Sequence, residues 1–173
     1  MKYWLISDTH FGHDKTIEFC GRPENFNELL LKGLNIVPVD SIFIHLGDIC
    51  IGNDYDWHRK MFYELPRCRK ILVRGNHDKK SNSWYYEIGW DFVCEQFRDT
   101  IFGKDILFSH VQVKDEGYDF NIHGHFHNSN HRRQEPQYTS ILSEKNLLYA
   151  PETENYKPVN LEKFIVERFG GKG

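Results

Sequence analysis

The sequence has no excess of positive charge, no long hydrophobic run and only four cysteines. Its 25 acidic residues outnumber its 22 lysines and arginines, so the net charge of −3 does not indicate a basic surface for duplex DNA. No stretch approaches the roughly 18 apolar residues that a membrane-spanning helix requires. The N-terminus turns polar at Ser7 and Asp8, which is too soon for a signal peptide. We therefore expect a cytoplasmic protein without a membrane partner.

The cysteines form no C-x-x-C pair, which excludes a cysteine zinc ribbon and gives no reason to expect a disulfide framework. Low-complexity runs, internal repeats and linkers rich in Pro, Gly or Ser are also missing. A chain of 173 residues has the size of one domain, so we expect a single domain over residues 1–173. Histidine, in contrast, is plentiful: the chain has ten, and their placement carries most of the functional information.

Short apolar runs with flanking turn residues recur along the chain and predict buried strands. They cover Tyr3–Ile6, Ser41–Leu46, Lys70–Val73, Ile106–Phe108 and Phe120–Ile122. Apolar residues at helical spacing predict helices at Asn25–Ile36, at Tyr55–Leu65 and at Leu161–Phe169, the last with Asn160 as N-cap.

Strands that alternate with helices indicate a mostly parallel sheet in the first half of the chain. The segment from Phe92 to Tyr149 is rich in predicted strands with shorter spacers, which suggests a second sheet. The pattern as a whole indicates an α/β sandwich.

Each of the five predicted strands is followed by Asp, Asn or His, and four of these five endings contain His. Ligands of open α/β sheets bind outside the carboxyl ends of the strands. Asp and Asn are ordinary turn residues, but turns do not explain the recurrent histidines. The candidate metal ligands are Asp8, His10, Asp48, Asn76, His110, His125 and His127.

These side chains offer oxygen and nitrogen without thiolate, which suits Mn²⁺, Fe or Zn²⁺ and excludes iron–sulfur sites. Seven ligands are too many for one four-coordinate metal, but they fit two metals that share a bridging carboxylate. Two such metals can stabilise both the entering and the leaving oxygen of an in-line displacement at phosphorus. The sequence therefore predicts a metal-dependent phosphohydrolase.

The chain resembles the calcineurin-like metallophosphoesterases, and within them the short, single-domain bacterial and phage branch. The resemblance rests on five motifs in the family's order: Asp8-x-His10, Gly47-Asp48, Gly75-Asn76-His77-Asp78, Ser109-His110 and Gly124-His125-Phe126-His127. The segments Ser7–His13, Phe19–Pro23 and Tyr156–Glu162 resemble the opening and the tail of the short branch. The resemblance implies a four-layer α-β-β-α sandwich of two mixed sheets flanked by helices.

The resemblance also implies a role for each candidate. Asp48 would bridge two metals, of which one is held by Asp8, His10 and His127 and the other by Asn76, His110 and His125. A hydroxide between the metals would attack phosphorus in line, and His77 would protonate the leaving oxygen or stabilise its charge. The implied cofactors are two divalent ions, with Mn²⁺ preferred and Fe, Zn, Ni or Co as alternatives.

Five other residues near these motifs have weaker assignments. Arg22 could clamp a phosphate, or it could be solvated or ion-paired. His13 and His123 are candidates for contacts with the metal ligands or the substrate. His45, inside a predicted strand, is expected to be buried and hydrogen-bonded, whereas His58 is expected to be solvated on a polar helix face.

The motifs leave the substrate open. After Gly47-Asp48 the chain lacks the Asp-Arg-Gly extension of the protein phosphatases, and it is too short for the cap domains of larger relatives. We therefore expect an open site. We favour a phosphodiester or nucleotide-type substrate, so the expected partner is a phosphorylated small molecule or a nucleotide. Lys79, Lys80 and the basic residues 131–133 could attract such an anion, or a nucleic acid.

Two alternatives remain at this stage: a nuclease, and a metal-binding interaction module of the same fold without catalysis. The oligomeric state is not predicted. The segment Leu147–Glu152 differs from the Asn-Val-Gly-type run that relatives often have there, and its role is left open.

Overall fold

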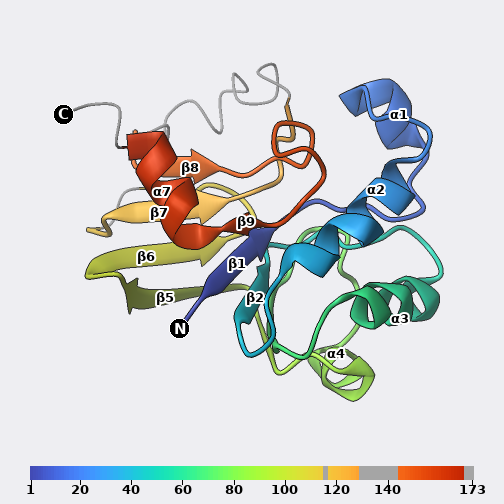
Figure 1. Ribbon diagram of the computed structural model, residues 1–173, viewed down its shortest axis with the longest axis horizontal. Helices are drawn as coiled ribbons and strands as arrows, with labels where there is room; N and C mark the ends of the chain where they lie inside the picture. Colours follow the sequence, from blue (N-terminus) through green and yellow to red (C-terminus); the bar gives the residue numbers. More distant parts are fainter. Residues whose placement is uncertain (115–116, 129–143, 170–173) are drawn as a thin grey trace.

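A computed structural model describes residues 1–114, 117–128 and 144–169 of the chain, which forms two β-sheets (Figure 1). The first sheet has five strands in the order β4-β3-β2-β1-β9, in which β1 to β4 are parallel and β9 is antiparallel to β1. Its strands are β1 (Tyr3–Ile6), β2 (Ile42–His45), β3 (Arg69–Val73), β4 (Phe92–Cys94) and β9 (Val159–Asn160).

Within the described residues, the second sheet has four strands in the order β5-β6-β7-β8. Strand β5 is antiparallel to β6, whereas β6, β7 and β8 are parallel, so both sheets are mixed. The second sheet was predicted from Phe92 onward, but β4 pairs with β3 and belongs to the first sheet. The four strands of the second sheet are β5 (Gln96–Ile101), β6 (Lys104–Ser109), β7 (Phe120–His123) and β8 (Asn146–Leu148).

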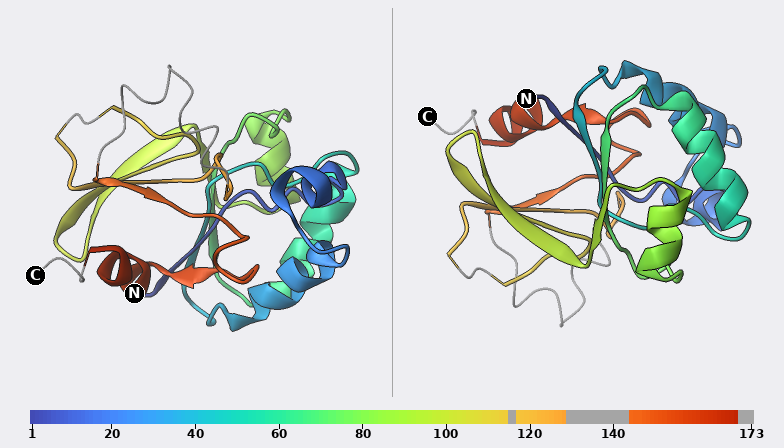
Figure 2. Two further views of the ribbon diagram at one scale, coloured as in Figure 1. Left: turned by 90° about the horizontal axis from the view of Figure 1, so that it is seen from above. Right: turned by 90° about the horizontal axis from the view of Figure 1, so that it is seen from below.

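Helices α1 to α4 lie together on one side of the first sheet, and the second sheet lies on the other (Figures 1 and 2). Helix α7 packs on β1 and β9. This arrangement confirms the predicted α/β sandwich of two mixed sheets flanked by helices. The helical segments are α1 (Lys15–Cys20), α2 (Phe26–Gly33), a 3-10 turn η1 (Leu34–Ile36), α3 (Asp54–Glu64), α4 (Asn82–Ile88) and α7 (Leu161–Phe169).

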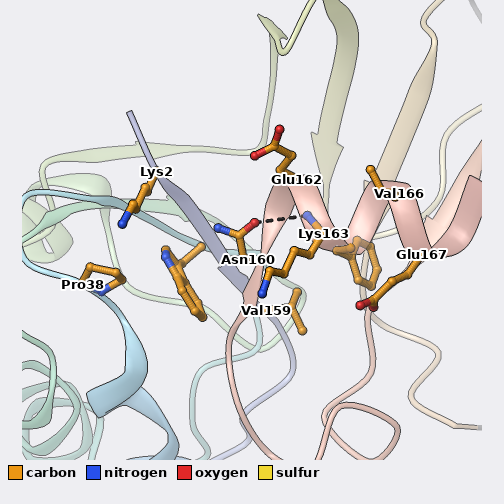
Figure 3. Close-up of a pocket in the computed structure, with 10 residues that line it drawn as sticks. Lys2, Pro38, Val159, Asn160, Glu162, Lys163, Val166 and Glu167 are labelled. Atoms are coloured by element: carbon orange, nitrogen blue, oxygen red, sulfur yellow. Dashed lines mark hydrogen bonds between the residues drawn. The ribbon is translucent and has the colours of Figure 1, made fainter. Parts of the chain in front are cut away.

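Helix α7 begins and ends where the sequence pattern predicts. The side-chain oxygen of Asn160 accepts a hydrogen bond of 3.1 Å from the backbone N–H of Lys163, as expected of an N-cap (Figure 3). Leu161 and Phe164 are buried against the sheet. The hollow beside this helix, lined in part by Lys2, lies near the N-terminal end of β1 and therefore away from the predicted ligands (Figure 3).

The hydrophobic core joins both sheets, because buried side chains of the first sheet, such as Leu5 and Ile44, belong to one cluster with Ile106 and Ile122 of the second. Among the described residues, no helix combines the length and the apolar character needed to cross a bilayer.

The prediction that His58 is solvated is wrong. Its side chain is buried, its Nδ1 atom lies 2.7 Å from the carbonyl oxygen of Asp54, and its ring contacts Trp84 and Tyr85. The reason is that α4, which carries both aromatic residues and was not predicted, packs on α3 and covers this face.

Candidate metal centre

The loops that follow β1 and β2 run side by side beyond the ends of the strands. The backbone N–H of Asp8 donates to the carbonyl of Gly47 over 2.9 Å, and that of His10 donates to the carbonyl of Asp48 over 3.0 Å. Because β1 and β2 are parallel, their carboxyl ends meet at one edge of the sheet. Asp8, His10 and Asp48 therefore lie close together.

Five of the seven candidate ligands adopt a left-handed backbone conformation, which is uncommon for residues other than glycine. Such a conformation costs of order 1–3 kcal/mol at each residue and persists only where the surrounding structure enforces it. Strained backbone of this kind is concentrated at functional sites. The φ angles are 51° at Asp8, 46° at His10, 57° at Asp48, 71° at His125 and 52° at His127.

The candidate ligands form two adjacent clusters. In each cluster one ligand atom of every residue lies within 4.8 Å of the others. Asn76 joins the second cluster, since its Oδ1 atom lies 3.1 Å from Nε2 of His110. The first cluster consists of Asp8, His10 and His127, and the second of Asp48, His110 and His125.

Asp48 lies between the two clusters. Its Oδ2 atom is 3.5 Å from Nε2 of His10 in the first cluster and 3.3 Å from Nε2 of His110 in the second. Its Oδ1 atom accepts a hydrogen bond of 2.7 Å from the backbone N–H of His77. One carboxylate oxygen therefore faces imidazole nitrogens from both clusters.

Asp8 has one oxygen that is satisfied by the protein and one that is not. Its Oδ2 atom accepts hydrogen bonds from the Ser7 hydroxyl (2.6 Å) and the backbone N–H of His125 (2.8 Å). Its Oδ1 atom is buried and has no hydrogen-bond partner among the described residues. It lies 3.8 Å from Nε2 of His10 and 3.9 Å from Nε2 of His127. A buried carboxylate oxygen in this setting fits a cation.

Two glycines allow the backbone to approach these carboxylates closely. A Cβ atom at Gly75 would overlap the Asp48 carboxylate, and one at Gly124 would overlap Ser7 and the Asp8 carboxylate. Any side chain at either position would displace the adjacent ligand.

The carboxylates shift the pKa values of the neighbouring imidazoles. Burial disfavours the charged forms of Asp48 and His110, but their mutual hydrogen bond and attraction outweigh it. They hold the pKa of Asp48 well below its usual range and raise the pKa of His110 to about 9. Burial likewise opposes charge on His127, yet hydrogen bonds with Cys20 and Glu152 and the charge of Asp8 raise its pKa to about 10. The carboxylates at this edge of the first sheet thus create an electrostatic field that favours cations.

The supporting role of Asp78 was missed, although Asp78 ends the Gly-Asn-His-Asp motif. Its buried carboxylate accepts hydrogen bonds from the backbone N–H groups of Asp48 (2.8 Å), Gly75 (2.8 Å) and Ile49 (3.1 Å). Burial and the charge of Asp48 raise its pKa to about 6. Asp78 joins the loop after β2 to the loop after β3.

A cavity of about 70 Å³ opens onto the two clusters. His77 lies at its mouth with 40% of its side chain exposed, and its Nε2 atom is 3.9 Å from Oδ2 of Asp48. The ring centroid of His13 lies 5.4 Å from the ring centroid of His10 and 6.2 Å from that of His77. The lining residues are His10, His13, Thr16, Phe19, Cys20, Asp48, Asn76, His77, His125 and His127.

Arg22 is buried, and its guanidinium is engaged by the protein. It donates to the carbonyl oxygens of Asp8 (2.6 Å) and Thr9 (2.7 Å) and to Oε1 of Glu152 (2.8 Å). The structure therefore favours the ion-paired alternative over a phosphate clamp. Glu152, whose segment had no predicted role, also lies 3.1 Å from Nδ1 of His127.

The remaining candidates have other contacts or lie outside the described residues. His123 is buried at the end of β7, and its ring packs against Phe126, the residue between His125 and His127. The Lys80 ammonium lies 3.9 Å from Asp54. The predicted basic segment at residues 131–133 lies outside the described residues.

Comparison with known proteins agrees with this geometry. Residues 1–167 match the family model described as "Calcineurin-like phosphoesterase". The chain is 32% identical over 174 residues to the uncharacterized protein MJ1445 of Methanocaldococcus jannaschii, covering 95% of this chain and 89% of that protein. It also resembles the crystal structure of AQ665, a protein of unknown function from Aquifex aeolicus. The TM-score is 0.73 and the identity 26%, with 96% of this chain and 98% of that chain covered.

Proposed function

Because this chain belongs to the calcineurin-like phosphoesterase family and is a phosphoesterase, we propose that it hydrolyses phosphoesters at a centre of two divalent metals. Asp48 would bridge the metals, and the observation that carries this proposal is the position of its Oδ2 atom between the two histidine clusters. One metal site would consist of Asp8, His10 and His127, and the other of Asn76, His110 and His125.

The donor set supports Mn²⁺ first, with Fe, Zn, Ni or Co as alternatives, because it combines carboxylate and amide oxygens with imidazole nitrogens. When bound, two such ions lower the pKa of the water that attacks phosphorus and neutralise charge on the phosphoryl oxygens. The unpartnered Oδ1 atom of Asp8 supports a cation in the first cluster.

His77 is positioned to act on the leaving group. It lies at the cavity mouth, and its backbone N–H is held by Oδ1 of Asp48. Oδ2 of the same carboxylate faces Nε2 of the ring over 3.9 Å. We propose that Nε2 of His77 donates a proton to the leaving oxygen, a role that typically contributes about 10²–10⁴-fold to the rate.

The size of the cavity supports a substrate of which only the phosphoryl group enters. A volume of about 70 Å³ is far below the roughly 300–1,000 Å³ of pockets that enclose a whole small molecule. The organic part of the substrate would then rest outside, near His13 and the exposed ring of Phe19. This open arrangement favours a phosphodiester or nucleotide-type substrate.

Mn²⁺-dependent hydrolysis of an aryl phosphomonoester and an aryl phosphodiester tests the proposal, with metal content measured on the same samples. We expect the wild type to hydrolyse the diester, and His77→Ala to lower kcat by about 10²–10⁴-fold while two metals stay bound. A wild type that binds two metals but hydrolyses neither ester would instead support the metal-binding interaction module.

A further inference from the structure

Three buried side chains connect the loop after α1, the loop after β8 and the metal-facing loop after β7. The Oε1 atom of Glu152 accepts a hydrogen bond of 2.8 Å from Nε of Arg22 and lies 3.1 Å from Nδ1 of His127. The exposed fractions of the side chains are 0% for Arg22, 4% for Glu152 and 7% for His127. The contact between Arg22 and Glu152 spans 130 positions of the sequence.

The chemistry of these groups determines which nitrogen of His127 carries the proton when the ring is neutral, as it must be to bind a metal. An ionised carboxylate can only accept hydrogen bonds, so the short contact with Glu152 requires a proton on Nδ1. A neutral ring protonated at Nδ1 has its lone pair on Nε2. That nitrogen lies on the side of the first cluster, 3.9 Å from the unpartnered Oδ1 atom of Asp8.

Arg22 is the more distant partner of this nitrogen. Its Nη2 atom lies 3.4 Å from Nδ1 of His127, whereas Oε1 of Glu152 lies at 3.1 Å. If Nδ1 accepted from Arg22, its lone pair would face the Glu152 carboxylate, which has no proton to donate. Nη2 also donates to the carbonyl of Asp8 over 2.6 Å. The guanidinium therefore holds Glu152 on one side and the backbone of the Asp8 loop on the other.

A further metal ion at this place is a competing explanation. One ligand atom each of Cys20, His127 and Glu152 lie within 4.8 Å of one another. However, the buried guanidinium of Arg22 already supplies a positive charge in contact with Glu152. A divalent cation beside it would be repelled at low dielectric constant. The arrangement is that of a ligand and its supporting carboxylate.

We propose that Glu152 is a positioning residue, which holds the Nδ1 proton of His127 and thereby directs Nε2 of that ring toward the first metal site. The inference rests on the proposed function insofar as it assigns His127 to a metal. Partners of this kind fix the tautomer and the orientation of a histidine ligand, and their loss typically weakens metal binding by about 10–100-fold.

Calorimetric titration of metal-free protein with Mn²⁺ tests this role in Glu152→Gln, which keeps the shape of the side chain but removes its charge. We expect one of the two sites to weaken by about 10–100-fold and the other to keep its affinity. The matched control is Glu154→Gln, two positions along the same loop, whose carboxylate pairs with Arg168. This control should bind both metals as the wild type does.

A second measurement does not depend on metal binding, and its wild-type part does not depend on the folding of a variant. In ¹⁵N-histidine spectra of the metal-free wild type, His127 should carry a protected, downfield Nδ1–H proton, which Glu152→Gln shifts upfield. A wild-type His127 without a proton on Nδ1, or a Glu152→Gln protein with both metal affinities unchanged, overturns the inference. A wild type that binds no metal overturns the proposed function, while the spectra still decide whether Glu152 holds the Nδ1 proton.

Discussion

The Nε2 atom of His45 lies 3.0 Å from the hydroxyl oxygen of Thr9, the residue between the candidate ligands Asp8 and His10. The backbone N–H of Gly47 donates to Nδ1 of His45 over 3.1 Å, so the proton of the neutral ring is on Nε2. The Thr9 hydroxyl in turn donates to the carbonyl of Ile49 over 2.8 Å. This network confirms that His45 is buried and hydrogen-bonded, and it joins the loops after β1 and β2.

Stability should decrease in acid because of His45. Complete burial lowers its pKa to about 3, from about 6.5 in an unfolded chain. Between these values the unfolded chain binds a proton that the folded protein does not, so the free energy of unfolding falls as the pH falls. The slope is about 1.4 kcal/mol per pH unit.

Urea unfolding of metal-free wild type and His45→Gln between pH 4.5 and 7 measures this contribution. The variant should be less stable at pH 7 but should lose less stability toward pH 4.5. If the free energy of unfolding depended on pH in the same way in both proteins, the predicted contribution of His45 would be contradicted.

Metal binding should release protons at pH 7. Hydrogen bonds and nearby carboxylates outweigh burial and raise the pKa values of His110 and His127 to about 9 and about 10, so both nitrogens of each ring carry a proton in the metal-free protein. A metal must displace these protons, and its apparent affinity should therefore increase as the pH rises from 6 toward 9. Calorimetry in buffers of different ionisation enthalpy should detect up to about two protons released. Metal binding without proton release would contradict this prediction.

Gly124→Ala should weaken metal binding through steric overlap. The added methyl group would meet the Ser7 hydroxyl and the Asp8 carboxylate, which must then move away from His125. We expect a loss of at least about 10-fold in affinity at the first site, measured by metal titration.

The control for this substitution is Gly52→Ala. Gly52 has a φ of 70° but no heavy atom within 4 Å of an added Cβ, so only a backbone cost of about 1–2 kcal/mol is expected. Its metal affinities should be those of the wild type. Equal metal affinities in the two variants would be inconsistent with the close approach at Gly124.

Ligand substitutions should separate the two sites. Asp48→Asn should weaken both metals, because Oδ2 of Asp48 faces both clusters. His127→Ala should mainly empty the first site, since its ring lies with Asp8 and His10. Metal content per protein, measured after dialysis, distinguishes the two outcomes. Equal loss of both metals from His127→Ala would contradict the proposed division of ligands.

The fold was predictable where local pattern decides it. Tyr3–Ile6 forms a strand and Leu161–Phe169 a helix over the predicted bounds, because each has its own periodicity and flanking signals. The burial of His58 was not predictable, because α4 covers it from a separate segment. The contacts of Glu152 were missed for the same reason, since its partners Arg22 and His127 lie far away in the sequence.

The sequence by itself determined the chemical nature of the candidate metal ligands and their place after successive strands. Parallel pairing then requires those strand ends to meet at one edge. Only the tertiary structure decided that Asp48 lies between two clusters and that Arg22 is engaged by the Asp8 loop and Glu152. The physical reason is that hydrogen bonds, burial and the strained backbone of the ligand loops arise from contacts between distant segments, which a local pattern of residues does not encode.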